Sequence, residues 1–147
     1  LIKDGVPAVG VVLAPALGVL WSGAAGQAFR VDGQGGRRAI ACRALPASGA
    51  VVLTSRSHRN PEALPAWMAQ FPESTLDFGG SSLKFCKVAD GSADLYPRFG
   101  PTSEWDTAAA SAVLLAAGGS VTTFDGAPLA YAKPEFRNPD FIARGKA

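Results

Sequence analysis

Cysteine and histidine are scarce in this chain of 147 residues, which contains two cysteines, Cys42 and Cys86, and one histidine, His58. Two cysteines provide neither the paired spacing of a zinc site nor the framework of a disulfide-rich secreted domain. Cys86 falls on the expected apolar face of a helix, where a reduced thiol is typical. The cysteines therefore favour a reducing, cytoplasmic setting.

A strong charge of either sign is also lacking. Fourteen Lys and Arg residues against twelve Asp and Glu residues give a net charge of +2, and the basic residues are scattered along the chain. This balance does not indicate a nucleic-acid-binding protein. Because 48% of the residues are hydrophobic, the chain can bury a core, and its length fits one ordinary domain.

The chain has no apolar run long enough to cross a membrane. The stretch from residue 6 to residue 20 is apolar, but Pro7, Gly10, Pro15 and Gly18 interrupt it. It is too short to span a bilayer core of about 30 Å, and no basic region precedes it. We therefore expect no integral membrane segment.

A starting methionine is absent as well. The chain opens on Leu1 and Ile2, inside a strand-like run that ends at the turn sequence Lys3-Asp4-Gly5. We interpret this as a fragment that has lost an N-terminal part. The strands expected before Arg30 would then expose unpaired edges, and the isolated chain would be prone to aggregation.

Two patterns divide the sequence into residues 1–46 and residues 47–147. The first part alternates short apolar runs with glycine-containing turns, which predicts antiparallel strands of an N-terminal sheet. The second part predicts a layered α/β fold, in which a mixed sheet is flanked by helices. We expect its strands at residues 50–55, 74–78, 93–99, 120–124, 128–131 and 141–143, its helices at 60–71, 82–90 and about 105–117, and a frayed tail at 144–147.

Polar residues stand at three expected junctions between a strand and a helix. Ser55–His58 ("SRSH") follow one strand, Gly79–Lys84 ("GGSSLK") open a helix, and Asp106 lies at the start of an alanine-rich helix. Helix starts attract anions, and ligands of α/β proteins bind near such junctions. Together these groups fit metal-assisted phosphate chemistry.

Each of these elements has a simpler explanation. A lone histidine such as His58 is most often a surface or capping residue. "GGSSLK" lacks the spacing of a Walker loop. Asp106 can complement the helix dipole without binding a metal.

These segments carry a resemblance to a known family. "SRSH", "GGSSLKFCKVADGSADLYPRFGPTSEWDTAA" and "KPEFRNPDFIAR" resemble the C-terminal part of the CysQ-type 3′(2′),5′-bisphosphate nucleotidases, in the inositol monophosphatase superfamily. The resemblance covers nearly the whole chain. The W-D-x-A-A element marks the superfamily, whereas "LYPRFGPTSEWD" with "GSSLK" is more specific to the nucleotidase branch.

The resemblance implies a layered sandwich of the inositol monophosphatase and sugar phosphatase type. Such a protein hydrolyses adenosine 3′,5′-bisphosphate to AMP and phosphate, and 3′-phosphoadenylylsulfate is a related substrate. The resemblance also implies that Mg²⁺ is the cofactor, that Asp106 is a metal ligand, and that Ser55, His58, Gly80 and Lys84 contact the nucleotide. It implies a cytoplasmic location, with peripheral attachment to the inner membrane as a variant.

The chain departs from the family pattern in two respects. Ala110 replaces the glycine that follows W-D-x-A-A, for which we expect a modest effect. The family's Glu-Glu element and D-P-[LI]-D-G-T segment, which supply most metal ligands, would precede Leu1. Since Mg²⁺ is rarely held by one carboxylate, we expect the isolated chain to be inactive or nearly so.

Two alternatives stay open. One is an inositol-phosphate or fructose-1,6-bisphosphate phosphatase of the same superfamily. The other is a non-catalytic nucleotide- or anion-binding remnant, in which Asp106 is only an acid at a helix start. The metal-ligand hypothesis requires that Asp106 share a cavity with Lys84 and His58.

Overall fold

The computed structural model describes residues 1–56, 60–80 and 82–146. The sequence-predicted contact His58 therefore lies outside the described residues.

The first part of the chain forms antiparallel hairpins, as predicted. A four-stranded sheet has the order β3 (Val9–Ala14), β4 (Val19–Ala24), β5 (Gln27–Val31) and β6 (Arg37–Ile40), preceded by the hairpin β1 (Ile2–Lys3) and β2 (Val6–Pro7). A short 3₁₀ helix, η1 (Pro15–Leu17), connects β3 to β4. The two-residue turn Asp4-Gly5 has positive φ at both positions, which matches the right-handed twist of a hairpin.

The second part forms a five-stranded mixed sheet with the order β11-β13-β9-β7-β8. Its strands are β7 (Val51–Thr54), β8 (Thr75–Phe78), β9 (Leu95–Arg98), β11 (Ser120–Thr123) and β13 (Phe141–Arg144). β7 runs parallel to β8 and β9, whereas β13 is antiparallel to both of its neighbours. The helices are α1 (Ala63–Met68), α2 (Leu83–Ala89) and α3 (Glu104–Ala116), and the short strands β10 (Thr102–Ser103) and β12 (Arg137–Asn138) pair with each other.

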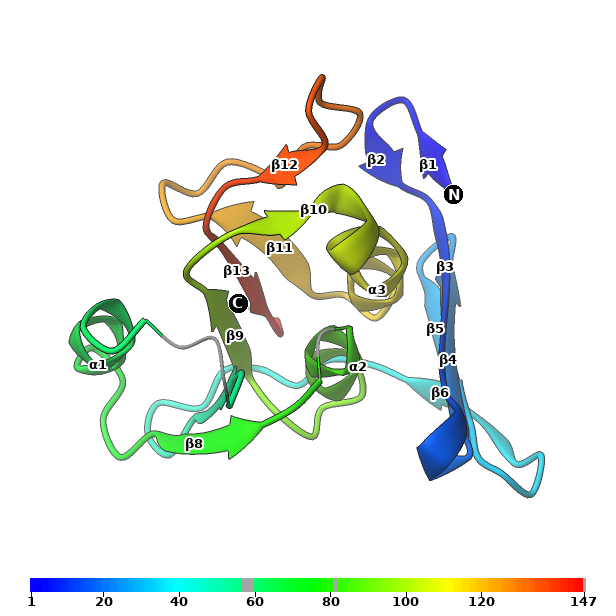
Figure 1. The fold of residues 1–147 in the computed structure, drawn as a ribbon. Coiled ribbons are helices and arrows are strands. Elements are labelled where there is room, and N and C mark those ends of the chain that lie inside the picture. The colour runs from blue at the N-terminus through cyan, green and yellow to red at the C-terminus, as the bar shows by residue number, and fades with distance from the viewer. Residues whose placement is uncertain (57–59, 81, 147) are drawn as a thin grey trace.

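Helices α2 and α3 lie between the two sheets (Figure 1). One hydrophobic core includes Trp21 of β4, Phe85 of α2, Val113 of α3 and Phe141 of β13. Ala110, which replaces the family glycine, is buried in the same core. This sandwich of layers confirms the predicted fold class.

Glycines allow α3 to approach the four-stranded sheet. A Cβ atom at Gly10 would lie 1.9 Å from the carbonyl oxygen of Ala109, and one at Gly23 would lie 2.6 Å from the Cα atom of Val113. Real Cβ atoms do not come so close, and α3 contributes mostly alanines to this contact. The small residues on both elements therefore determine how closely the layers pack.

The division between residues 46 and 47 stays a prediction. It falls in the connection between β6 and β7, while the common core draws residues from both sides of it. The strand expected at residues 128–131 is wrong, because among the described residues this segment makes only a single bridge, between Pro128 and Thr122. The expected frayed tail is also wrong for residues 144–146. Arg144 belongs to β13, Gly145 donates its amide hydrogen to the carbonyl oxygen of Asp94, and Lys146 donates to that of Arg43. The tail is ordered because its backbone groups find these partners.

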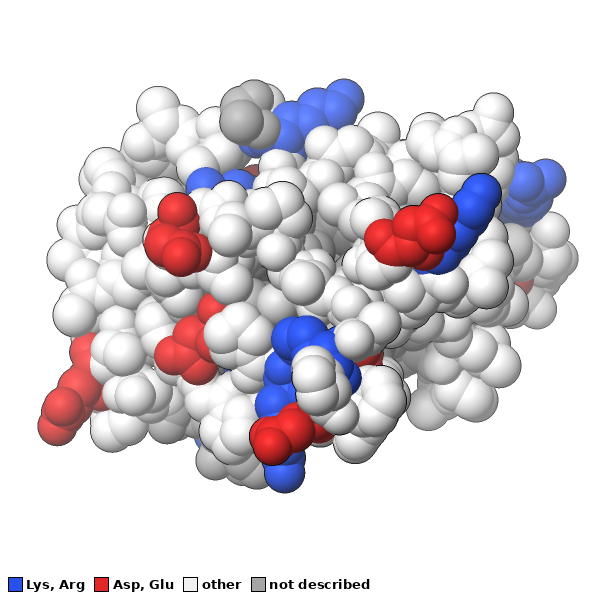
Figure 2. Space-filling view, turned by 90° about the horizontal axis from the view of Figure 1, so that it is seen from above, with Lys and Arg blue, Asp and Glu red and all other residues white. Residues whose placement is uncertain are grey.

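The surface is mixed in charge. On the face shown in Figure 2, acidic and basic side chains are interspersed among uncharged residues, without a continuous band of either sign. Both cysteines are buried and unbonded. In the part of the chain that the structure describes, no helix has the length and apolar character needed to cross a membrane.

Candidate functional site

The candidate site lies at the carboxyl ends of three parallel strands. Ser55 and Arg56 follow β7, Gly79 follows β8, and Arg98 ends β9. Leu53 and Tyr96 face the core that contains α2, whereas Val52 and Leu95 pack on the opposite side against residues of α1. The helices that follow β7 and β8 therefore cover opposite faces of the sheet. Such a crossover point opens a crevice that commonly binds ligands.

A cavity of about 620 Å³ occupies this crevice. It contains four of the five predicted site residues. We call it the phosphate pocket, and it is lined by Ser55, Arg56, Phe78, Gly79, Gly80, Lys84, Tyr96, Arg98, Pro101, Thr102 and Asp106. The required shared cavity of Asp106 and Lys84 is present, while His58 lies outside the described residues.

Lys84 is the most deeply buried charged side chain of the pocket, with 1% of its surface exposed. Its ammonium group donates to the carbonyl oxygen of Gly79 at 3.0 Å and to the hydroxyl of Ser55 at 3.4 Å, and it lies 4.7 Å from the centre of the Tyr96 ring. Burial, and to a smaller extent the positive charge of Arg98, lowers the pKa of Lys84 to about 8. A bound anion would relieve both effects.

Arg98 is a site residue that the sequence did not identify. Its Nη1 donates to the Ser55 hydroxyl at 3.3 Å and its Nη2 to the carbonyl oxygen of Pro101 at 3.2 Å. Its Nε is buried and finds no hydrogen-bond partner in the described structure. Its position at the end of a predicted strand, within the motif "LYPRFGPTSEWD", was the available signal.

Two cationic groups therefore converge on one small hydroxyl. Ser55 accepts hydrogen bonds from both Lys84 and Arg98, and neither cation forms an ion pair in the described part of the chain. Two cations without a carboxylate partner are favourable for an anion that can accept several hydrogen bonds. A phosphate group has this chemistry.

Asp106 caps the helix on which it stands. Its Oδ2 accepts the amide hydrogen of Ser103 at 2.8 Å, in a capping box at the start of α3. The Ser82 hydroxyl donates to the backbone oxygen of Asp106, which connects α3 to the segment that opens α2. A carboxylate can accept about four hydrogen bonds or metal contacts, so capping leaves capacity for a ligand in the pocket.

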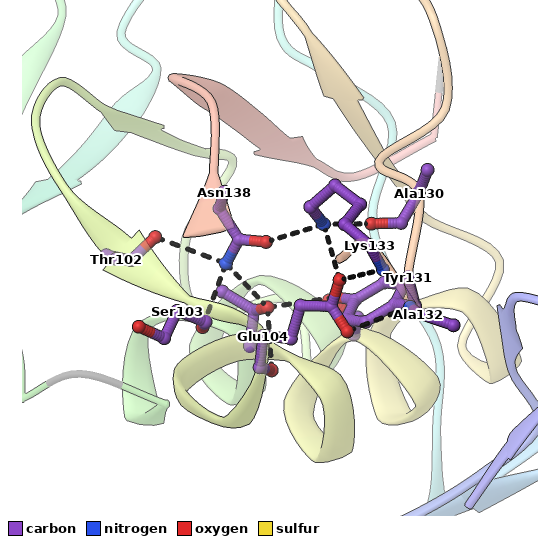
Figure 3. Close-up of polar contacts among 10 residues, drawn as sticks. Thr102, Ser103, Glu104, Ala130, Tyr131, Ala132, Lys133 and Asn138 are labelled. Atoms are coloured by element: carbon purple, nitrogen blue, oxygen red, sulfur yellow. Dashed lines mark hydrogen bonds and ion pairs between the residues drawn. The ribbon is translucent and has the colours of Figure 1, made fainter. Parts of the chain in front are cut away.

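A buried polar network holds the first turn of α3 in place (Figure 3). The Asn138 amide donates to the backbone oxygen of Ser103 at 2.9 Å and to the hydroxyls of Thr102 and Thr107. The Glu104 carboxylate pairs with Lys133 at 2.8 Å and accepts the amide hydrogens of Ala132 and Lys133. We call residues 130–138, which supply these groups, the clamp segment. It fixes the turn that carries Asp106.

The described residues do not form a complete metal site. They contain no group of three or more His, Cys, Asp or Glu side chains that could hold an ion. Mg²⁺ prefers six oxygen ligands in near-octahedral geometry, and Asp106 supplies one carboxylate. Asp106 therefore fits as one ligand of a set that the described residues do not complete.

Comparisons with known proteins agree with this fold and site. The chain is 47% identical over 142 residues to the 3′(2′),5′-bisphosphate nucleotidase CysQ of Escherichia coli K12, covering 96% of this chain and 56% of that protein. It is 40% identical over 146 residues to the CysQ of Buchnera aphidicola, covering 97% and 54% of the two chains. The chain thus spans a little over half the length of the curated relatives that it matches.

A solved structure and a family model also match this chain. The crystal structure of CysQ from Bacteroides thetaiotaomicron, a bacterial member of the inositol monophosphatase family, superposes with a TM-score of 0.88 at 31% identity, covering 99% of this chain and 60% of that one. The model of the inositol monophosphatase family matches residues 1–143. The chain therefore belongs to the inositol monophosphatase family.

Proposed function

We propose that this chain is part of a Mg²⁺-dependent phosphatase that removes the 3′-phosphate of adenosine 3′,5′-bisphosphate to give AMP. The observation that carries the proposal is the convergence of Lys84 and Arg98 on Ser55, in a pocket that Asp106 also lines. The similarity to proteins named bisphosphate nucleotidases supports the choice of a nucleotide as substrate. 3′-Phosphoadenylylsulfate is a second candidate substrate with the same 3′-phosphate.

In this proposal Lys84, Arg98 and Ser55 bind and orient the phosphate. The two cations offset its negative charge before and during cleavage, when charge on the phosphoryl oxygens has to be stabilised. Gly80, which carries no side chain, leaves the backbone of the pocket wall accessible to the nucleotide. His58 remains a proposed contact.

Asp106 is proposed as one ligand of the divalent cation. A bound Mg²⁺ would supply Lewis-acid polarisation of a phosphoryl oxygen and a more acidic water molecule. The rigid start of α3 aims the Asp106 carboxylate at the pocket, since both the capping box and the clamp segment hold that turn.

The catalytic part of the proposal is tested in a chimera in which this chain replaces the matching segment of the Escherichia coli relative. With Mg²⁺ present, the chimera should release phosphate from adenosine 3′,5′-bisphosphate at least about tenfold more efficiently than from inositol 1-phosphate. The reverse preference would favour the inositol-phosphate alternative.

Substitution of Asp106 separates an enzyme from a non-catalytic remnant. Asp106→Asn keeps an oxygen for the capping bond but loses the negative charge, so the turnover of the chimera should fall by about 100-fold or more. Asp125→Asn, in an exposed turn, should leave turnover unchanged. A chimera without turnover whose Mg²⁺ affinity is unchanged by Asp106→Asn would support the remnant.

A further inference from the structure

The amine of Lys84 has the surroundings of a nucleophile as well as those of a phosphate ligand. A lysine becomes nucleophilic when burial or a nearby cation favours its neutral form. Both conditions hold for Lys84, which is 1% exposed and donates to the same Ser55 hydroxyl as Arg98. The function proposed above uses Lys84 only as a cation, so the reactivity of its neutral form is a separate property.

The other four lysines of the chain have different surroundings. Lys87 and Lys133 form ion pairs with carboxylates, and Lys3 and Lys146 are exposed. Lys84 forms no ion pair in the part of the chain that the structure describes. Its lowered pKa of about 8 gives it a larger neutral fraction near neutral pH than an exposed lysine has.

The groups around Lys84 determine which reagents reach its amine. Arg98 and Ser55 line the same cavity, and the Nε atom of Arg98 is buried without a hydrogen-bond partner in the described structure. A phosphate bound by these two residues therefore lies next to the amine that shares the Ser55 hydroxyl with them.

An acyl phosphate carries a reactive carbonyl beside such a phosphate. Its carbonyl carbon is separated from the phosphorus by a single oxygen atom, so binding of the phosphate brings the carbonyl close to the Lys84 amine. Since Lys84 is reached only from the cavity, small acyl groups such as acetyl are favoured over long ones.

We propose that Lys84 is a site of acylation by small acyl phosphates, which enter the phosphate pocket through their phosphate group. The amine nitrogen attacks the carbonyl carbon, a C–N bond forms, and the C–O bond to the phosphate breaks. The electrons of that bond and the amine proton leave with inorganic phosphate, so no further reactant is needed. The resulting amide is uncharged, and the pocket loses one of its two cations. This inference rests on the proposed function and adds a covalent regulation of the same site.

The test treats the unmodified chain with acetyl phosphate at about pH 7.5 and follows the acetylation of each lysine by peptide mass spectrometry. Lys84 should react at least about tenfold faster than the exposed Lys3, because the pocket concentrates the reagent beside a partly neutral amine. Inorganic phosphate should suppress the reaction at Lys84 and leave that at Lys3 unchanged. With p-nitrophenyl acetate, an acyl donor without a phosphate, most of the preference for Lys84 should disappear.

Two arginine variants separate recognition of the phosphate from general reactivity, with Lys3 as the internal standard. Arg98→Gln should slow the acetylation of Lys84 by about tenfold. Arg38→Gln, at an exposed position outside the pocket, should leave the rate unchanged.

Two results would overturn the inference: acetylation of Lys84 no faster than that of Lys3, or a rate at Lys84 that inorganic phosphate does not reduce. In either case, phosphate binding that is weakened by Lys84→Met would still support the proposed function. Failure of the chain to bind inorganic phosphate would remove both.

Discussion

At the scale of single residues, the buried ammonium group of Lys84 connects phosphate binding to pH. Its pKa is lowered to about 8, mainly by burial and then by Arg98, from an ordinary value of 10.5. The protonated form that binds an anion is therefore lost in a pH range where most lysines stay charged. We expect the affinity for inorganic phosphate to be highest below pH 8 and to fall by up to about tenfold per pH unit above it.

The measurement is the dissociation constant of phosphate at several pH values from 7 to 9.5. Lys84→Arg serves as the control, because a guanidinium group stays protonated over this range, and its affinity should vary much less with pH. A flat profile for the unmodified chain would show that Lys84 does not titrate there.

The same lowered pKa also affects the stability of the fold. Between pH 8 and 10.5 the unfolded chain binds more protons at Lys84 than the folded chain does. The contribution of Lys84 to the free energy of unfolding therefore increases with pH in this range.

Asp106 shows how two interpretations of one residue can both hold. Its position in the sequence fits either a helix cap or a metal ligand. The structure shows the cap directly, since Oδ2 accepts the Ser103 amide hydrogen, and it also places the side chain in the phosphate pocket. The capping bond uses part of the carboxylate, so it does not exclude the proposed metal contact.

At the scale of elements, the clamp segment stabilises the start of α3. Asn138→Ala removes the donated bonds to Ser103, Thr102 and Thr107 and leaves the backbone oxygen of Ser103 without this partner. We expect the free energy of unfolding to fall by about 2–3 kcal/mol in urea titrations. Arg137→Ala, at the exposed neighbouring position, should change it by less than about 0.5 kcal/mol. Similar small losses in both variants would mean that the clamp contributes little.

The clamp segment also carries backbone strain. Ala132 and Phe136 adopt positive φ angles of 64° and 53°, which are unfavourable for residues other than glycine. Hydrogen bonds from the Ala132 amide to Glu104 and from the Glu104 amide to Phe136 hold this conformation. The sequence offered no sign of this arrangement, because its partners lie about thirty positions apart.

The contact between α3 and β3 gives a packing prediction. Gly10→Ala places a methyl group 1.9 Å from the carbonyl oxygen of Ala109, so the helix has to move away from the sheet. We expect a loss of about 3 kcal/mol or more in the free energy of unfolding. Val11→Ala, on the exposed face of the same strand, should cost less than about 1 kcal/mol. Thermal and urea unfolding of both variants will check this, and equal stability would show that the layers can separate at low cost.

At the scale of the whole molecule, the four-stranded sheet ends in an exposed edge. Among the described strands β3 pairs only with β4, and Val9, Val11 and Leu13 are between 41% and 59% exposed. An apolar edge of this kind favours association with another chain. We expect the isolated chain to self-associate as its concentration rises, and Val11→Lys to increase the monomeric fraction in sedimentation velocity experiments. Leu17→Lys, outside β3, should have little effect. A monomeric unmodified chain would contradict the aggregation that the sequence suggested.

The kinds of element in the two parts of the chain were largely predictable. The Asp4-Gly5 turn and the alternation of strands and helices after residue 47 each carry a local signal, and the structure confirms them. The ordered tail at residues 144–146 was not predictable, because its backbone partners, Asp94 and Arg43, are distant in the sequence. Small, polar or charged residues at a chain end are typical of a frayed terminus. The backbone partners that order this tail are visible only in the folded structure.

The elements and the family can be predicted from the sequence alone, because turn residues, apolar periodicity and the W-D-x-A-A and "GSSLK" motifs act over short distances. The meeting of Lys84 and Arg98 at Ser55 arises only when the chain folds, because Ser55 lies 29 and 43 positions away from them. The physical reason is that parallel strands bring their carboxyl ends together at one edge of the sheet, whatever their separation along the chain. The hydrogen bond from Asn138 to Ser103 at the start of α3 likewise joins two positions that are 35 residues apart in the chain.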